Sequence, residues 1–97
     1  MHLLLVDDHE VVRRGLRQLL SDGYPHADIA EAGTVATARA QLKRQPWQLM
    51  LLDLNLPGAS GIELLAHARL DYPAMAVLVL SAYPEEEFAV NAFKSSG

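Results

Sequence analysis

The stretch Leu49–Gly58, LMLLDLNLPG, begins as an apolar run and carries an aspartate, Asp53, near its end. Asn55, Pro57 and Gly58 follow at once, and these residue types favour turns. An unpaired carboxylate in an apolar environment is strongly unfavourable, so folded chains avoid that arrangement or use it. The run therefore predicts a buried strand with a functional carboxylate, and the positions of the other carboxylates indicate its role.

The composition is that of one folded domain. The chain has 97 residues, of which 51% are hydrophobic and 21% charged. It has no cysteine, so a bound metal would rely on oxygen or imidazole ligands. The net charge of -4 argues against nucleic-acid binding by this segment on its own. No apolar run is long enough to span a membrane and the N-terminus lacks a signal peptide, so we expect a cytosolic protein.

Apolar runs alternate with amphipathic segments four times along the chain. The expected strands span residues 3–6, 28–32, 47–52 and 76–80. The expected helices begin at Asp8, at Thr34, at a capping box formed by Ser60 and Glu63, and at Pro84. A strand–helix order repeated in this way predicts an α/β fold with a parallel sheet covered on both faces.

Several residues have ordinary structural explanations. The apolar residues of the first expected helix share one face, which we expect to be buried: Val12, Leu16, Leu19 and Leu20. Its basic residues point away and are expected to be solvated: Arg13, Arg14 and Arg17. His9 is interpreted as a solvated residue of the first helical turn rather than a ligand, and Trp47 as a packing residue.

The side chains that can carry chemistry follow the predicted strands. Asp7 and Asp8 come directly after the first strand, and Asp53 and Asn55 lie at the end of the third. Ser81 follows the fourth strand. The carboxyl ends of parallel strands meet at one edge of a sheet, where doubly wound folds collect ligands. We therefore expect these side chains to lie on one rim.

Three carboxylates in one crevice repel each other and call for a counter-cation. Mg²⁺ prefers oxygen ligands and typically binds one or two carboxylates, so Asp8, Asp53 and a main-chain carbonyl suit it. Mg²⁺ beside an aspartate suggests phosphoryl transfer, in which the carboxylate can be the nucleophile. The hydroxyl of Ser81 would donate a hydrogen bond to a phosphoryl oxygen.

Four motifs spread over the chain are similar to those of a known family. They are VDDHE at 6–10, LLDLNLPGASG at 51–61, VLSAY at 79–83 and AFKSSG at 92–97. Together they resemble the receiver domain of two-component response regulators. The DDH triplet and the following VVRRGLRQLL most resemble the subfamily whose output is a LuxR-type helix-turn-helix DNA-binding domain. The resemblance implies a flavodoxin-like, doubly wound parallel sheet.

The resemblance also implies a role for each rim residue. Asp53 would be the phosphoacceptor and Asp8 a direct Mg²⁺ ligand. Asp7 would help indirectly, through water or by orientation, and the main-chain carbonyl of Asn55 would complete the metal site. Ser81 matches the hydroxyl residue that hydrogen-bonds the phosphoryl group.

The chain departs from the family pattern at its end. Family members continue into a fifth strand, which carries a lysine, and a fifth helix, so residues 1–97 correspond to a receiver domain truncated before that strand. Lys94 precedes this point and is not given the role of that lysine. The expected strand over residues 76–80 would leave an open sheet edge. We therefore expect either a fragment of a longer protein or an oligomer that covers the edge.

Three functions compete for these residues. The resemblance favours a switch, in which a sensor histidine kinase phosphorylates Asp53 and the added charge regulates an attached or partner output domain. The alternative is an interaction module of the same fold that works without phosphorylation. An Mg²⁺-dependent phosphohydrolase of the haloacid dehalogenase type is less favoured, because that family needs an aspartate where this chain has Asn55.

Overall fold

The computed structural model describes residues 1–56 and 61–80. It contains four strands, β1 (His2–Val6), β2 (Asp28–Ala32), β3 (Leu49–Asp53) and β4 (Ala76–Leu80). The described helices are α1 (Glu10–Gly23), α2 (Val35–Arg44) and α3 (Gly61–Asp71). The expected strands and the first three helices are confirmed within a few residues. The expectations for Ser60, Ser81 and the helix beginning at Pro84 lie outside the described residues.

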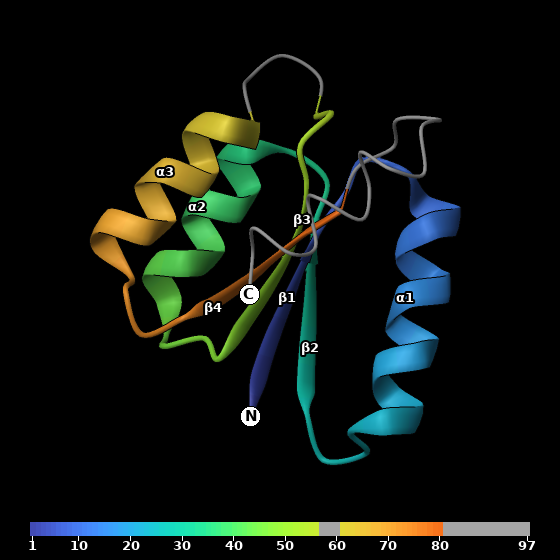
Figure 1. Cartoon of the computed structure of the whole chain (residues 1–97). Coiled ribbons are helices and arrows are strands. Elements are labelled where there is room, and N and C mark those ends of the chain that lie inside the picture. Colours follow the sequence, from blue (N-terminus) through green and yellow to red (C-terminus); the bar gives the residue numbers. More distant parts are fainter. Residues whose placement is uncertain (57–60, 81–97) are drawn as a thin grey trace.

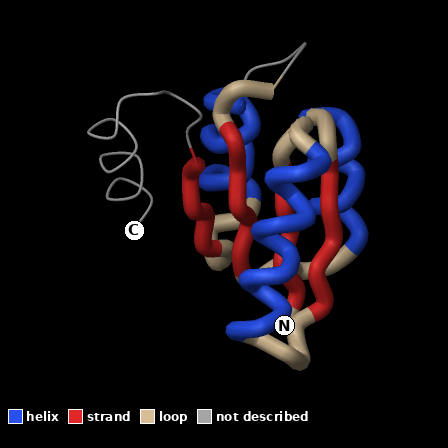
Figure 2. The backbone as a smooth tube through the Cα atoms, turned by 90° about the vertical axis from the view of Figure 1, so that its right-hand side faces the viewer, coloured by secondary structure: helices blue, strands red, loops and turns tan. Residues whose placement is uncertain are grey.

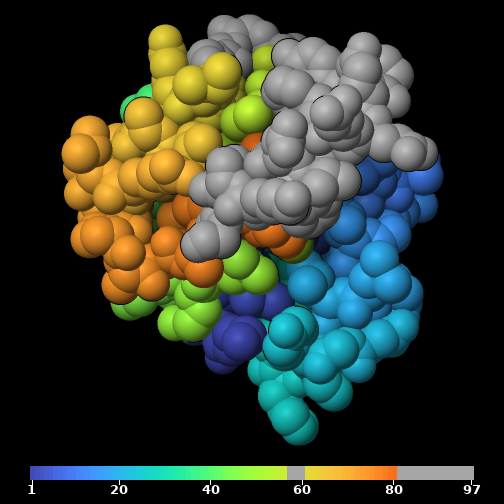
Figure 3. Space-filling model, in the orientation of Figure 1, coloured from blue at the N-terminus to red at the C-terminus, as the bar shows by residue number. Residues whose placement is uncertain are grey.

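The four strands form one parallel sheet in the order β2-β1-β3-β4. Helix α1 lies on one face of the sheet, and α2 and α3 lie together on the other (Figures 1 and 2). In the space-filling view α1 forms one flank of the molecule and α3 the opposite flank (Figure 3). This arrangement confirms the flavodoxin-like, doubly wound fold.

The core lies mainly between the sheet and the α2–α3 layer. Side chains of a strand alternate between the two faces, so every second residue of β1 and β3 points toward these helices. The fully buried members on this face include Leu4, Met50 and Leu52, which pack with Leu42 of α2 and Leu64 of α3. Nearly continuous apolar strands of this kind are typical of a parallel sheet buried on both faces.

Trp47 belongs to this core, as predicted, although β3 begins two residues later, at Leu49. Its indole Nε1–H donates a hydrogen bond to the main-chain carbonyl of Gln41, at 2.9 Å. The bond satisfies the one polar group of a buried ring and fixes the connection between α2 and β3.

Helix α1 differs from the prediction in the face that it turns inward. None of its residues is fully buried, and Val12 and Leu19 are 45% and 70% exposed. Leu16 and Leu20 are half-buried, as predicted. About one turn before Leu16, the helix directs the Arg13 side chain toward the sheet, where its guanidinium binds Glu31 of β2. The expected solvated position of Arg13 is therefore wrong, whereas Arg14 is exposed as expected.

Helices α1 and α2 differ in how their N-termini are capped. Thr34 caps α2 as predicted, since its hydroxyl accepts a hydrogen bond from the amide of Thr37 and the reciprocal bond is also present. Asp8 does not cap α1, because the N-cap position falls on His9 and no side chain caps that end. The carboxylate of Asp8 is thus left free for other contacts.

Strand β4 pairs with β3 and with no other strand in the described part of the chain. The prediction that an oligomer covers this edge stays a prediction. Within residues 1–56 and 61–80, the structure contains no helix with the length and apolar character needed to cross a bilayer.

Candidate functional site

Two buried carboxylates lie side by side at the carboxyl ends of β1 and β3. Asp53 is the last residue of β3 and is 3% exposed, and Asp7 follows β1 directly and is 4% exposed. The parallel register pairs Val6 with Leu52, which brings the two aspartates to neighbouring positions. Asp8, exposed beside them, completes the acidic cluster that the sequence predicted. Ser81 lies outside the described residues.

His9 joins this cluster. Its ring Nδ1 lies 3.0 Å from Oδ1 of Asp7, 3.0 Å from Oδ1 of Asp8 and 3.9 Å from Oδ2 of Asp53. Together with these three aspartates it offers ligand atoms that all lie within 4.8 Å of one another. The His9 side chain is 57% exposed, as expected for a solvated residue, but it occupies the N-cap position before α1 rather than the first turn, and its Nδ1 faces the carboxylates.

Burial, hydrogen bonds and neighbouring charges change the proton affinity of Asp53 and His9. Burial raises the pKa of Asp53, and the neighbouring carboxylates of Asp7 and Asp8 raise it further. A hydrogen bond from the amide of Asn55, at 2.9 Å, acts in the opposite direction. The hydrogen bond with Asp7 and the charges of Asp8 and Asp7 raise the pKa of His9. The pocket therefore attracts cations, protons included.

Backbone contacts hold the two buried aspartates in place. The amide of Asp7 donates to the carbonyl of Ala32 in β2, at 3.0 Å, and the carbonyl of Asp7 accepts from Arg13 of α1. On the other strand, Gly61 at the start of α3 packs against Leu54, so closely that a Cβ at this glycine would lie 2.7 Å from the Leu54 main chain. A larger residue at this position would push α3 away from the segment that follows Asp53.

The donor set fits a hard divalent ion. Carboxylate oxygens of Asp8 and Asp53 are ligands that Mg²⁺ prefers, and Asp8 leaves one side of the pocket open to water. Asn55 is exposed, and its amide donates a hydrogen bond to Oδ1 of Asp53. The Nδ1 of His9 lies within 3.0 Å of an oxygen of Asp7 and of an oxygen of Asp8, so it shares this pocket with the carboxylates.

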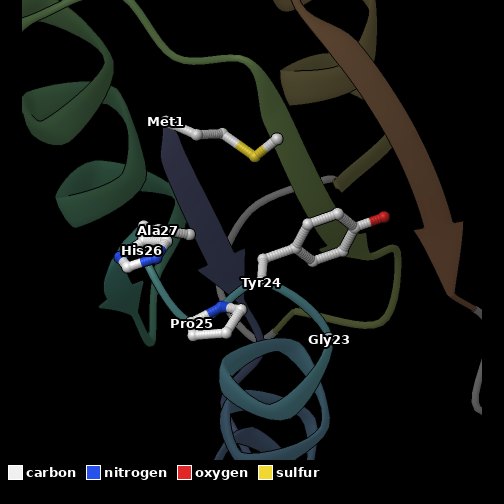
Figure 4. A pocket seen from close by; sticks show the side chains of 6 residues that line it. All are labelled: Met1, Gly23, Tyr24, Pro25, His26 and Ala27. Carbon is white, nitrogen blue, oxygen red and sulfur yellow. The ribbon is translucent and has the colours of Figure 1, made fainter.

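A second hollow lies at the opposite end of the sheet. It has a volume of about 300 Å³ and is lined by Met1 and by residues 23–27 of the α1–β2 connection. Figure 4 shows that the Met1 side chain and the Tyr24 ring extend in the same direction, with Pro25, His26 and Ala27 beside them. Its lining is mostly apolar and holds no carboxylate, so it offers no comparable chemistry.

The sequence reasoning found the three aspartates and missed two residues that contact them, His9 and Arg13. His9 directly follows two aspartates, and that adjacency was a usable signal. Arg13 gave no such signal, because its contact depends on how α1 is rotated against the sheet.

The comparisons agree on one family. Residues 3–97 match the model of the response regulator receiver domain. The DNA-binding transcriptional activator DevR/DosR of Mycobacterium tuberculosis is 41% identical over 91 residues, which cover 93% of this chain and 42% of that protein. The chain thus spans less than half of that relative's length.

Solved structures show the same likeness. The crystal structure of a LuxR-family two-component response regulator from Aurantimonas has a TM-score of 0.77 at 32% identity, over 99% of this chain and 68% of that one. A response regulator from Burkholderia pseudomallei, solved with a phosphorylated aspartic acid, a calcium ion and citrate, has a TM-score of 0.78 at 26% identity. That match covers 99% of this chain and 55% of the other.

Proposed function

Because the chain belongs to the response regulator receiver domain family, we propose that Asp53 accepts a phosphoryl group from a sensor histidine kinase and so switches an output. A carboxylate oxygen of Asp53 attacks the phosphorus of the kinase phosphohistidine. The phosphorus–nitrogen bond breaks, and the electron pair and a proton go to the released imidazole. The product is an acyl phosphate whose added charge changes the surface around the pocket.

The observation that carries this proposal is the burial of Asp53 against two further carboxylates at a strand end. A nucleophile at the end of a strand is held in a fixed position, and its burial shields it partly from water. The phosphorylated aspartic acid and calcium ion of the Burkholderia pseudomallei structure support the same reading of this chain.

The neighbouring residues would bind the metal ion and the phosphoryl group. Asp8 and the main-chain carbonyl of Asn55 would hold Mg²⁺ together with Asp53, and Asp7 would act through water or by orientation. Mg²⁺ would screen the negative charge that gathers when the phosphoryl group approaches the carboxylates. The hydroxyl of Ser81 would hydrogen-bond the transferred group.

The output is proposed to be a transcription-regulating domain of the LuxR-type helix-turn-helix class. The relative DevR/DosR is named a DNA-binding transcriptional activator, and the Aurantimonas regulator is assigned to the LuxR family. The net charge of -4 favours a regulatory rather than a DNA-contacting role for this segment itself. A cytoplasmic location follows for a switch that receives its phosphoryl group from a kinase and regulates transcription.

The test is intact-mass measurement after incubation with acetyl phosphate and Mg²⁺. We expect one phosphoryl group on the wild-type chain and none on Asp53→Asn. The matched control is Asp28→Asn, because its carboxylate is 80% exposed and lies outside the cluster. Labelling of Asp53→Asn to the wild-type extent would overturn the proposal, and no labelling of any chain would favour the unphosphorylated interaction module.

A further inference from the structure

We propose that Arg13 of α1 is a positioning residue for the acidic pocket, because its guanidinium holds the main-chain carbonyl of Asp7 and the carboxylate of Glu31 together. This inference rests on the proposed function. It adds a residue outside the cluster that fixes how the cluster's carboxylates are presented to a cation.

The guanidinium of Arg13 makes two contacts with different elements. Its Nη1–H donates to the carbonyl of Asp7, and its Nε–H donates to Oε1 of Glu31 in β2, at 3.0 Å. The side chain is 19% exposed, whereas that of Arg14, one position further along the helix, is 76% exposed. Arg13 is therefore a bridge between α1, the end of β1 and β2, and not a surface ion pair.

Glu31 is itself held from a second side. Arg17, one turn further along α1, donates to Oε2 of Glu31 at 2.6 Å. Two arginines thus share one carboxylate, which lowers the pKa of Glu31 and keeps it ionised. Only Arg13 also reaches the pocket, so the two arginines form a natural comparison.

The hydrogen bond from Arg13 to the Asp7 carbonyl restrains the Asp7 main chain. Its amide is bonded to Ala32, so the contact from Arg13 leaves neither polar group of the Asp7 main chain free to turn. The side chain of Asp7 in turn accepts a hydrogen bond from the amide of His9, at 2.8 Å. Asp8 lies between Asp7 and His9, so these contacts fix the direction of the main chain through Asp8.

Gly33 provides the room for this contact. A Cβ built at Gly33 would lie 3.2 Å from Nη1 of Arg13 and 4.0 Å from the carbonyl oxygen of Asp7. The guanidinium therefore lies against the connection between β2 and α2, close to the tip of β1. Groups that orient metal ligands from outside typically change metal affinity about 10–100-fold when they are removed.

The experiment compares Arg13→Met with Arg17→Met, since both keep an apolar stem and remove an arginine from Glu31. Mg²⁺ affinity is measured by calorimetry, amide hydrogen exchange at Asp7 and His9 by NMR, and the free energy of unfolding in urea. We expect Arg13→Met to weaken Mg²⁺ binding about tenfold and to speed exchange at both amides. We expect Arg17→Met to leave the Mg²⁺ affinity and the two exchange rates near their wild-type values. The two variants should change the free energy of unfolding by similar amounts.

Equal effects of the two variants on Mg²⁺ affinity and exchange would overturn the inference, because Arg13 would then act only through its ion pair with Glu31. Arg13→Gln replaces Arg13→Met if the latter does not fold, with the same expected results. If the wild-type chain binds no Mg²⁺ and takes no phosphoryl group, the proposed function fails, and the exchange rates alone then decide the role of Arg13.

Discussion

Asp53 is a carboxylate held where ionisation is disfavoured. It is buried, it faces two other carboxylates, and its partners among the described residues are the amide of Asn55 and, more distantly, the ring of His9. An acid whose pKa is raised by folding contributes stability at low pH, and this contribution is lost as pH rises through the folded pKa. At neutral pH and without a cation, Asp53 therefore destabilises the fold that positions it.

Replacing Asp53 by asparagine should thus stabilise the metal-free protein. At pH 7 in EDTA, we expect Asp53→Asn to raise the free energy of unfolding, since the variant removes a carboxylate whose ionised form is disfavoured by burial and by two neighbouring carboxylates. The gain should shrink as pH falls toward 3.8, the ordinary pKa of the group, and as Mg²⁺ is added. Urea unfolding of wild type and Asp53→Asn at several pH values measures this, with Asp28→Asn as the control. A lower stability of Asp53→Asn than of wild type in EDTA would show that ionised Asp53 does not destabilise the metal-free fold.

Helix α1 shows how far an element can be predicted from its sequence. Its position, its length and the half-burial of Leu16 and Leu20 follow from the apolar spacing. The rotation of the helix about its axis does not follow from this spacing. Arg13 faces the sheet and donates to Glu31 and to the Asp7 carbonyl, while Val12 and Leu19 stay exposed. Such pairings join residues far apart in the chain, so a helical periodicity cannot show them. The strand ends were predictable because parallel pairing alone brings Asp7 and Asp53 together.

The two helical layers should differ in what they contribute to stability. Leu42 of α2 is 2% exposed and Leu19 of α1 is 70% exposed. We expect Leu42→Ala to lower the free energy of unfolding by roughly 2–5 kcal/mol, as for other buried leucines. Leu19→Ala should change it by less than about 0.5 kcal/mol, as for a surface site. Urea unfolding of the two variants measures the contrast, and equal losses would show that the outer side of α1 is packed.

The acidic pocket is a product of the sheet topology. Asp8 and Asp53 are far apart in the sequence, and no local segment brings them together. The placement of β1 beside β3 in the middle of a parallel sheet does so, with α1 and the start of α3 closing around the two strand ends. Ligand binding at this point of a doubly wound sheet needs residues from both strands at once.

The shared cation pocket is tested by the affinity of the folded chain for Mg²⁺, measured by isothermal titration calorimetry on wild type, Asp8→Asn and Asp53→Asn. We expect one Mg²⁺ bound per wild-type chain and an affinity at least about tenfold weaker in either variant. Asp28→Asn should bind as the wild type does. Unchanged affinity in both Asp8→Asn and Asp53→Asn would contradict the claim that the ends of β1 and β3 form a single cation pocket.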